Sequence, residues 1–224
     1  MGSAIGEMLP LAIGIAISPL PIIAIILILT TPQARTNGLA FLGGWLLGLA
    51  VVAVVVVIIT DAGGAATSND TSRIVSVITL VLGLLLLFLA WRKFHKRPGP
   101  GEKTPLPKWM AALDRFTPAR SVAVGALLAG PKPKNLILNA AAAAGIAQSG
   151  LGGVQQAVVM LLLVVVGSLG IIIPVGVYFA MGDKAAPVLD GWKTWLAANN
   201  ATMMIVLFLV FGVALIGKGI GGLS

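Results

Sequence analysis

Two lysines within a long apolar stretch have the clearest chemical meaning in this sequence. Lys132 and Lys134 lie inside Val122–Ala147, in the run Gly-Pro-Lys-Pro-Lys-Asn. A lysine at the centre of a membrane-spanning helix costs roughly 2.5–3.5 kcal/mol, whereas a leucine or isoleucine returns only about 0.3–0.6 kcal/mol. A chain that keeps two such charges is expected to pair them or to use them. We therefore predict that the pair binds an anionic group, such as sulfate, phosphate or carboxylate.

The residues around this pair favour a polar cavity. Asn135 and Asn139 are four residues apart and share one face of a helix. No carboxylate lies deep in an apolar stretch, so the substrate itself is the expected counter-ion. Two other interpretations stay open: the lysines extend to the membrane surface, or the span begins only after Lys134.

Paired prolines predict broken helices at two corresponding positions. Pro19 and Pro21 recur as Pro131 and Pro133, displaced by 112 residues, half of the 224-residue chain. A proline inside a helix removes a backbone hydrogen bond and costs about 3 kcal/mol. Both breaks should fall near the bilayer midplane, where exposed N–H groups favour an anion. Ser18 is expected to bond to the backbone at the first break, and two simple kinks are the alternative.

The composition requires a membrane around these elements. Of the 224 residues, 58% are hydrophobic and 10% are charged, whereas soluble domains have about 25% charged residues. We predict an all-α integral membrane protein. Its six spans are expected at Ala4–Thr31, Gly38–Thr60, Ile74–Trp91, Val122–Ala147, Val154–Met181 and Ala201–Leu223.

The basic residues predict the orientation. Eight of the 15 lysines and arginines lie in Arg92–Arg120, which we place in the cytoplasm. Eleven basic residues then lie inside and two outside, with both termini outside the cytoplasmic membrane. With this topology, the net charge of +8 points to anionic membrane lipids rather than to nucleic acid.

Three spans on each side of this loop predict two inverted repeats. Residues 1–91 form the first, 92–120 the linker and 121–224 the second, because an odd number of spans inverts the second half. Within the linker, residues 106–116 have apolar positions at helical spacing. A short amphipathic helix is expected there, either on the inner leaflet or against the protein's own cytoplasmic face.

Enzymatic and metal chemistry find no support in the sequence. The chain has no cysteine and one histidine, and it lacks a His-Glu-x-x-His motif and a deep aspartate pair. We expect no catalytic residue, no metal and no cofactor. Gly44-x-x-x-Gly48 and Gly217-x-x-x-Gly221 are helix-packing motifs that would allow a homodimer.

Three motifs resemble those of the peptidoglycolipid-addressing (GAP, sulfolipid-addressing) family, a branch of the lysine-exporter superfamily. They are Ile17-Ser-Pro-Leu-Pro-Ile-Ile23, Ala40-Phe-Leu-Gly-Gly-Trp-Leu-Leu-Gly48 and Gly130-Pro-Lys-Pro-Lys-Asn135. The resemblance covers essentially the whole chain. It implies a six-span protein that helps to move envelope glycolipids or peptidolipids to the cell surface, with its central site at the paired proline motifs.

The lysines within the apolar stretch and the family resemblance together predict an exporter of an anionic amphiphile, with an envelope lipid as the expected substrate. The expected substrate-binding residues are Ser18, Pro19, Pro21, Pro131, Lys132, Pro133, Lys134, Asn135 and Asn139. Two alternatives stay open: an exporter of a small amino acid or ion, and a non-transporting partner of a larger lipid-export machinery. The lack of deep acidic residues disfavours export of lysine or a metal cation.

Overall fold

The computed structural model describes residues 1–63, 68–95 and 116–223, and every regular element among them is a helix. In chain order these are α1 (Gly2–Ala16), α2 (Pro19–Leu29), α3 (Ala34–Gly63), α4 (Ser68–His95), α5 (Pro118–Ala129), α6 (Pro133–Ala147), α7 (Gly153–Gly167), α8 (Leu169–Met181), the 3₁₀ turn η2 (Gly182–Lys184) and α9 (Ala185–Gly221).

The helices account for three or four membrane spans by length and composition. Ala34–Thr60, Arg73–His95 and a span within Leu169–Gly221 qualify directly, and α1 with α2 forms a fourth if this bent pair is counted as one. The sequence predicted six. The difference arises because the predicted fourth and fifth spans are each divided into two short helices, α5–α6 and α7–α8.

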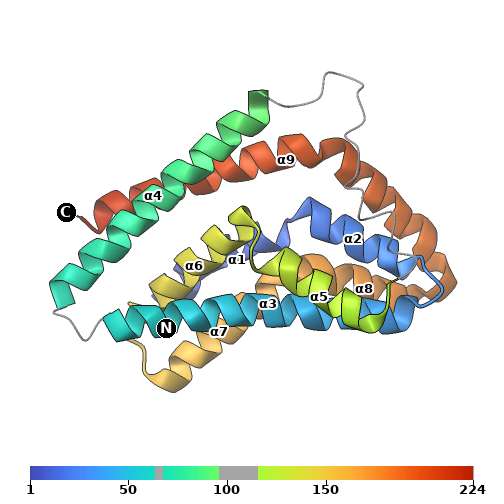
Figure 1. Cartoon of the computed structure of the whole chain (residues 1–224), viewed down its shortest axis with the longest axis horizontal. Coiled ribbons are helices and arrows are strands. Elements are labelled where there is room, and N and C mark those ends of the chain that lie inside the picture. Colours follow the sequence, from blue (N-terminus) through green and yellow to red (C-terminus); the bar gives the residue numbers. More distant parts are fainter. Residues whose placement is uncertain (64–67, 96–115, 224) are drawn as a thin grey trace.

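Both predicted proline breaks are present. The axes of α1 and α2 differ by 54°, and α5 ends at Ala129 before α6 begins at Pro133. The α1–α2 and α5–α6 pairs run in opposite directions, and their breaks lie next to each other in the middle of the molecule (Figure 1). A third interruption, at Ser168, was not predicted, whereas Pro174 lies within α8.

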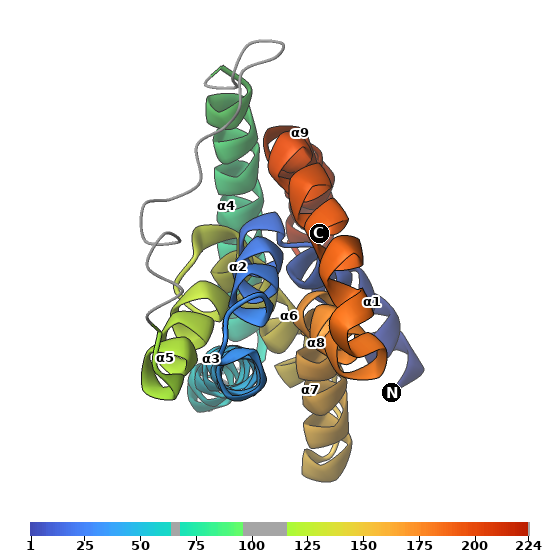
Figure 2. The same cartoon turned by 90° about the vertical axis from the view of Figure 1, so that its right-hand side faces the viewer.

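Glycines allow close packing within two pairs of helices, one pair on each side of the molecule. α4 lies along α9 on one side, and α3 lies along α5 on the other (Figures 1 and 2). A Cβ on Gly44 would clash with the Val122 carbonyl of α5, and one on Gly83 would lie 2.9 Å from the Gly212 carbonyl of α9. Gly44-x-x-x-Gly48 is therefore used inside the chain, whereas a Cβ on Gly217 would meet no atom within 4 Å.

The surface of the long helices is apolar. On α3 the exposed side chains include Leu47, Val51 and Ile58, while Phe41, Trp45 and Leu49 of the same helix are buried. An apolar exterior around an apolar core is the pattern of a helix bundle in lipid. The predicted helix at 106–116 lies almost wholly outside the described residues, and α4 continues through Arg92–His95 before the gap.

Candidate functional site

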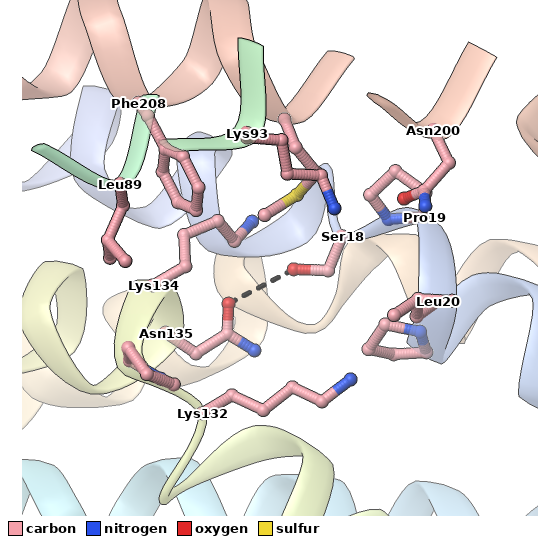
Figure 3. A pocket seen from close by; sticks show the side chains of 13 residues that line it. Ser18, Pro19, Leu20, Leu89, Lys93, Lys132, Lys134, Asn135, Asn200 and Phe208 are labelled. Carbon is pink, nitrogen blue, oxygen red and sulfur yellow. Dashed lines mark hydrogen bonds between the residues drawn. The ribbon is translucent and has the colours of Figure 1, made fainter. Parts of the chain in front are cut away.

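The two helix breaks enclose a cavity of about 260 Å³, named the break cavity below. Side chains from α4 and α9 complete its wall, and the lysines of α4 and of the second break enter it from different directions (Figure 3). The lining residues are Ser18, Pro19, Leu20, Pro21, Leu89, Lys93, Lys132, Pro133, Lys134, Asn135, Asn200, Met204 and Phe208.

The prolines of α2 leave two carbonyls of the first break without helical donors, and polar side chains replace those donors. A helical carbonyl accepts from the N–H four residues later, so the prolines deprive Ile15 and Ile17 of a donor. The Ser18 hydroxyl lies 2.6 Å from the Ile15 carbonyl oxygen, to which it donates. Lys134 Nζ donates to the Ile17 carbonyl at 3.0 Å and to the Gly14 carbonyl at 2.6 Å.

Lys134 is therefore engaged with the backbone at the end of α1. Its side chain is only 5% exposed. A cation there also meets the negative end of the α1 dipole. Sequence reasoning searched for a carboxylate partner and missed these carbonyls, which come from residues 117 and 120 positions away in the chain.

Asn135 joins the first break to the second. Its Nδ2 donates to the Leu128 carbonyl at 3.1 Å, and its Oδ1 lies 3.0 Å from the Ser18 hydroxyl. The Leu128 carbonyl belongs to the last turn of α5, where carbonyls lack helical donors. This side chain thereby connects α2, α5 and α6 at the cavity wall.

Lys132 and Lys93 differ from Lys134 in their bonding. Among the described residues neither ammonium group has a hydrogen-bond or ion-pair partner, and no carboxylate lines the cavity. The ion pairs in this part of the chain, Glu7–Lys218 and Asp190–Lys193, involve side chains outside the cavity lining. Two lysines without partners, in a cavity whose described lining has no carboxylate, give this cavity a positive electrostatic potential.

The backbone adds donors to the same cavity. α2 and α6 both begin there, and neither helix has a side-chain N-cap bond. In the first turns, Leu20, Lys134 and Asn135 keep backbone N–H groups for which the described residues supply no acceptor. The positive ends of two helix dipoles therefore reinforce the charge of the lysines.

The structure adds two residues that the sequence analysis did not single out. Asn200 of α9 is 7% exposed, and its Oδ1 has no partner among the described residues. Lys93 was counted with the basic loop, but α4 continues far enough to carry it to the cavity. The Asn199-Asn200 pair inside an otherwise apolar stretch was the available signal for the first.

Of the nine residues predicted to form the site, seven line the break cavity, and Pro131 and Asn139 do not. Asn139 lies on α6 and donates from Nδ2 to the Leu49 carbonyl of α3 at 2.9 Å. Its Oδ1 is buried without a partner in the described part of the chain. Asn139 thus contributes to packing between α6 and α3.

Long apolar helices, two of them broken around a cationic cavity, define an integral membrane protein of α-helical type. The chain belongs to the family of the Sap, sulfolipid-1-addressing protein (SfLAP), whose family model matches residues 8–221. This match confirms the resemblance found in the sequence motifs. The family is linked to sulfolipid addressing and is not a known enzyme family. Comparisons with curated proteins and with solved structures find no match.

Proposed function

We propose that this protein moves an anionic amphiphile, a cell-envelope lipid with a sulfate or phosphate group, across the cytoplasmic membrane. One observation carries the proposal: Lys132 and Lys93 line a carboxylate-free cavity without partners among the described residues. The family name supports a sulfate-bearing lipid, because it refers to sulfolipid-1. A mostly apolar cavity with a few convergent polar groups is the usual form of a binding site for a small ligand.

The site residues divide into two roles in this proposal. Lys132 and Lys93 bind the anionic head group, assisted by the backbone N–H groups at the starts of α2 and α6. Lys134, Ser18 and Asn135 hold the two breaks in shape through their bonds to carbonyls. Asn200 supplies a further amide to the head group from α9.

A six-span inverted repeat is part of the proposal. It counts α1–α2, α5–α6 and α7–α8 each as one interrupted span, beside α3, α4 and α9. The packing supports this view: α3 contacts α5 and α6, as α7 and α8 contact α1 and α2, while α4 contacts α9. Exchanging the halves maps the α3 contacts onto those of α7 and α8 and maps the α4–α9 contact onto itself, as an inverted repeat requires.

The orientation is also proposed, with both termini outside and the Arg92–Arg120 loop in the cytoplasm. A reporter fused after Ser224 should then read as outside, and one inserted within residues 97–103 should read as inside. Reports from the same side of the membrane would contradict the inverted repeat.

The test of function is transport by the purified protein in liposomes. A fluorescent sulfated lipid should move between leaflets, and Lys132→Met should abolish the movement while the exposed-site control Lys184→Met leaves it unchanged. Both variants lose one positive charge, so only the position of the charge differs. Flux of a small amino acid or ion would support that alternative, and no flux without added machinery would support the role of a non-transporting partner.

A further inference from the structure

A second cavity, of about 330 Å³, lies between α2, α8 and α9 and is named the tryptophan cavity below. Its lining has no charged side chain among the described residues: Ile22, Gly170, Ile173, Pro174, Trp192, Trp195 and Leu196. Trp195 is 58% exposed and Ile173 is 49% exposed, so the cavity opens toward the exterior of the bundle.

One row of side chains on α9 lines both cavities. Trp192 and Leu196 belong to the tryptophan cavity, and Asn200, Met204 and Phe208 belong to the break cavity. Successive members are four residues apart, so each lies one turn from the next. On α2, Pro21 lines one cavity and the adjacent Ile22 lines the other, so the two cavities follow the same α2–α9 contact.

We infer that the tryptophan cavity holds an alkyl chain of the amphiphile whose anionic head group occupies the break cavity. This inference rests on the proposed function and deepens it. The eight residues from Asn200 to Trp192 span about 12 Å of helix. That length fits within one leaflet, which is half of a hydrocarbon core of roughly 30 Å. The uncharged lining excludes a second head group, and the opening at Trp195 lets the chain enter from the membrane.

Trp192 and Trp195 report directly on the chain. In nanodiscs of phosphatidylcholine, a protein carrying Trp91→Phe and Trp109→Phe retains these two indoles and Trp45, which is 1% exposed and shielded from lipid. A few mole per cent of phosphatidic acid with mid-chain bromine is then titrated, because bromine quenches indole fluorescence only near contact. The control is the same titration with brominated phosphatidylcholine, which carries the same quencher on a lipid without net charge.

We expect saturable quenching by the brominated phosphatidic acid and only weak, non-saturable quenching by brominated phosphatidylcholine. Lys132→Met should weaken the saturable component at least tenfold, and Lys184→Met should leave it unchanged. Inorganic sulfate should relieve the quenching more than chloride at equal ionic strength, which separates competition for the head-group site from screening. Trp192→Phe with Trp195→Phe should remove the signal.

A second variant changes the tryptophan cavity and leaves both reporter indoles in place. Ile173→Phe narrows the tryptophan cavity and should weaken binding of the long-chain lipid severalfold, while binding of water-soluble dihexanoyl phosphatidic acid stays unchanged. Equal quenching by the two brominated lipids would mean that the indoles contact only bulk lipid and would overturn the inference. If dihexanoyl phosphatidic acid still binds in a Lys132-dependent manner, the proposed function survives that result; if it does not, both fail.

Discussion

Replacing Lys134 by Met should destabilise the protein, although it removes a buried charge. Considered from the sequence alone, Met at positions 132 and 134 should preserve or raise stability, because lysines without partners cost free energy in a membrane. The structure separates the two positions. Lys134 donates to the carbonyls of Gly14 and Ile17 at 2.6 and 3.0 Å, whereas Lys132 has no bond to lose among the described residues.

The magnitude follows from the two bonds. A hydrogen bond to a charged group contributes about 1.5–3 kcal/mol net of the hydration that it replaces. Losing both should lower the free energy of unfolding by about 3–6 kcal/mol. Pro21 has no N–H to offer the Ile17 carbonyl, and the Ser18 N–H, four residues after Gly14, bonds to the Ala16 carbonyl instead. For soluble chains of this length, Tm shifts by about 2–4 °C per kcal/mol, so a fall of roughly 6–24 °C is expected.

Thermal unfolding in detergent, followed by far-UV circular dichroism, measures this effect. Lys132→Met is the matched control and should leave Tm unchanged or raise it. A Lys134→Met protein at least as stable as the wild type would refute the assignment of Lys134 to the α1 carbonyls.

Three further outcomes are expected in the same unfolding assay. Ser18→Ala should cost about 1–3 kcal/mol because it leaves a buried carbonyl without a donor, whereas Ser149→Ala, in an exposed turn, should cost about 0.5 kcal/mol or less. Gly44→Ala should cost more than about 1 kcal/mol by forcing α3 away from α5, while the neighbouring Gly43→Ala should be tolerated, since a Cβ there meets nothing within 4 Å. Glu7→Gln removes an exposed ion pair to α9 and should change the free energy of unfolding by less than about 1 kcal/mol, by an amount that shrinks in 1 M salt.

The sequence by itself determined the helical class and the positions of the two proline breaks. Both are local properties. Two prolines two residues apart remove two N–H groups in any environment, and new helices begin at Pro19 and at Pro133. The single prolines Pro10 and Pro174, by contrast, lie within α1 and α8. The apolar composition likewise requires a nonpolar surrounding for the exposed faces of α3 and α4. The break at Ser168 escaped prediction because it contains no proline and is a single-residue irregularity.

Only the tertiary structure decided what each polar group at the breaks does. Lys132 and Lys134 have the same chemistry, nearly the same sequence context and a place in the same cavity lining, yet Lys132 has no partner among the described residues while Lys134 bonds to carbonyls at the end of α1. Their difference arises because Lys132 is the extended N-cap of α6, whereas Lys134 lies in the first turn of that helix, where its side chain meets carbonyls more than 100 residues away in the chain. Lys93 and Asn200 joined the site in the same way, since α4 and α9 pack over the breaks only in the folded bundle. The spacing of residues in the sequence predicts which side chains are neighbours on one helix, whereas a binding site depends on which helices pack together.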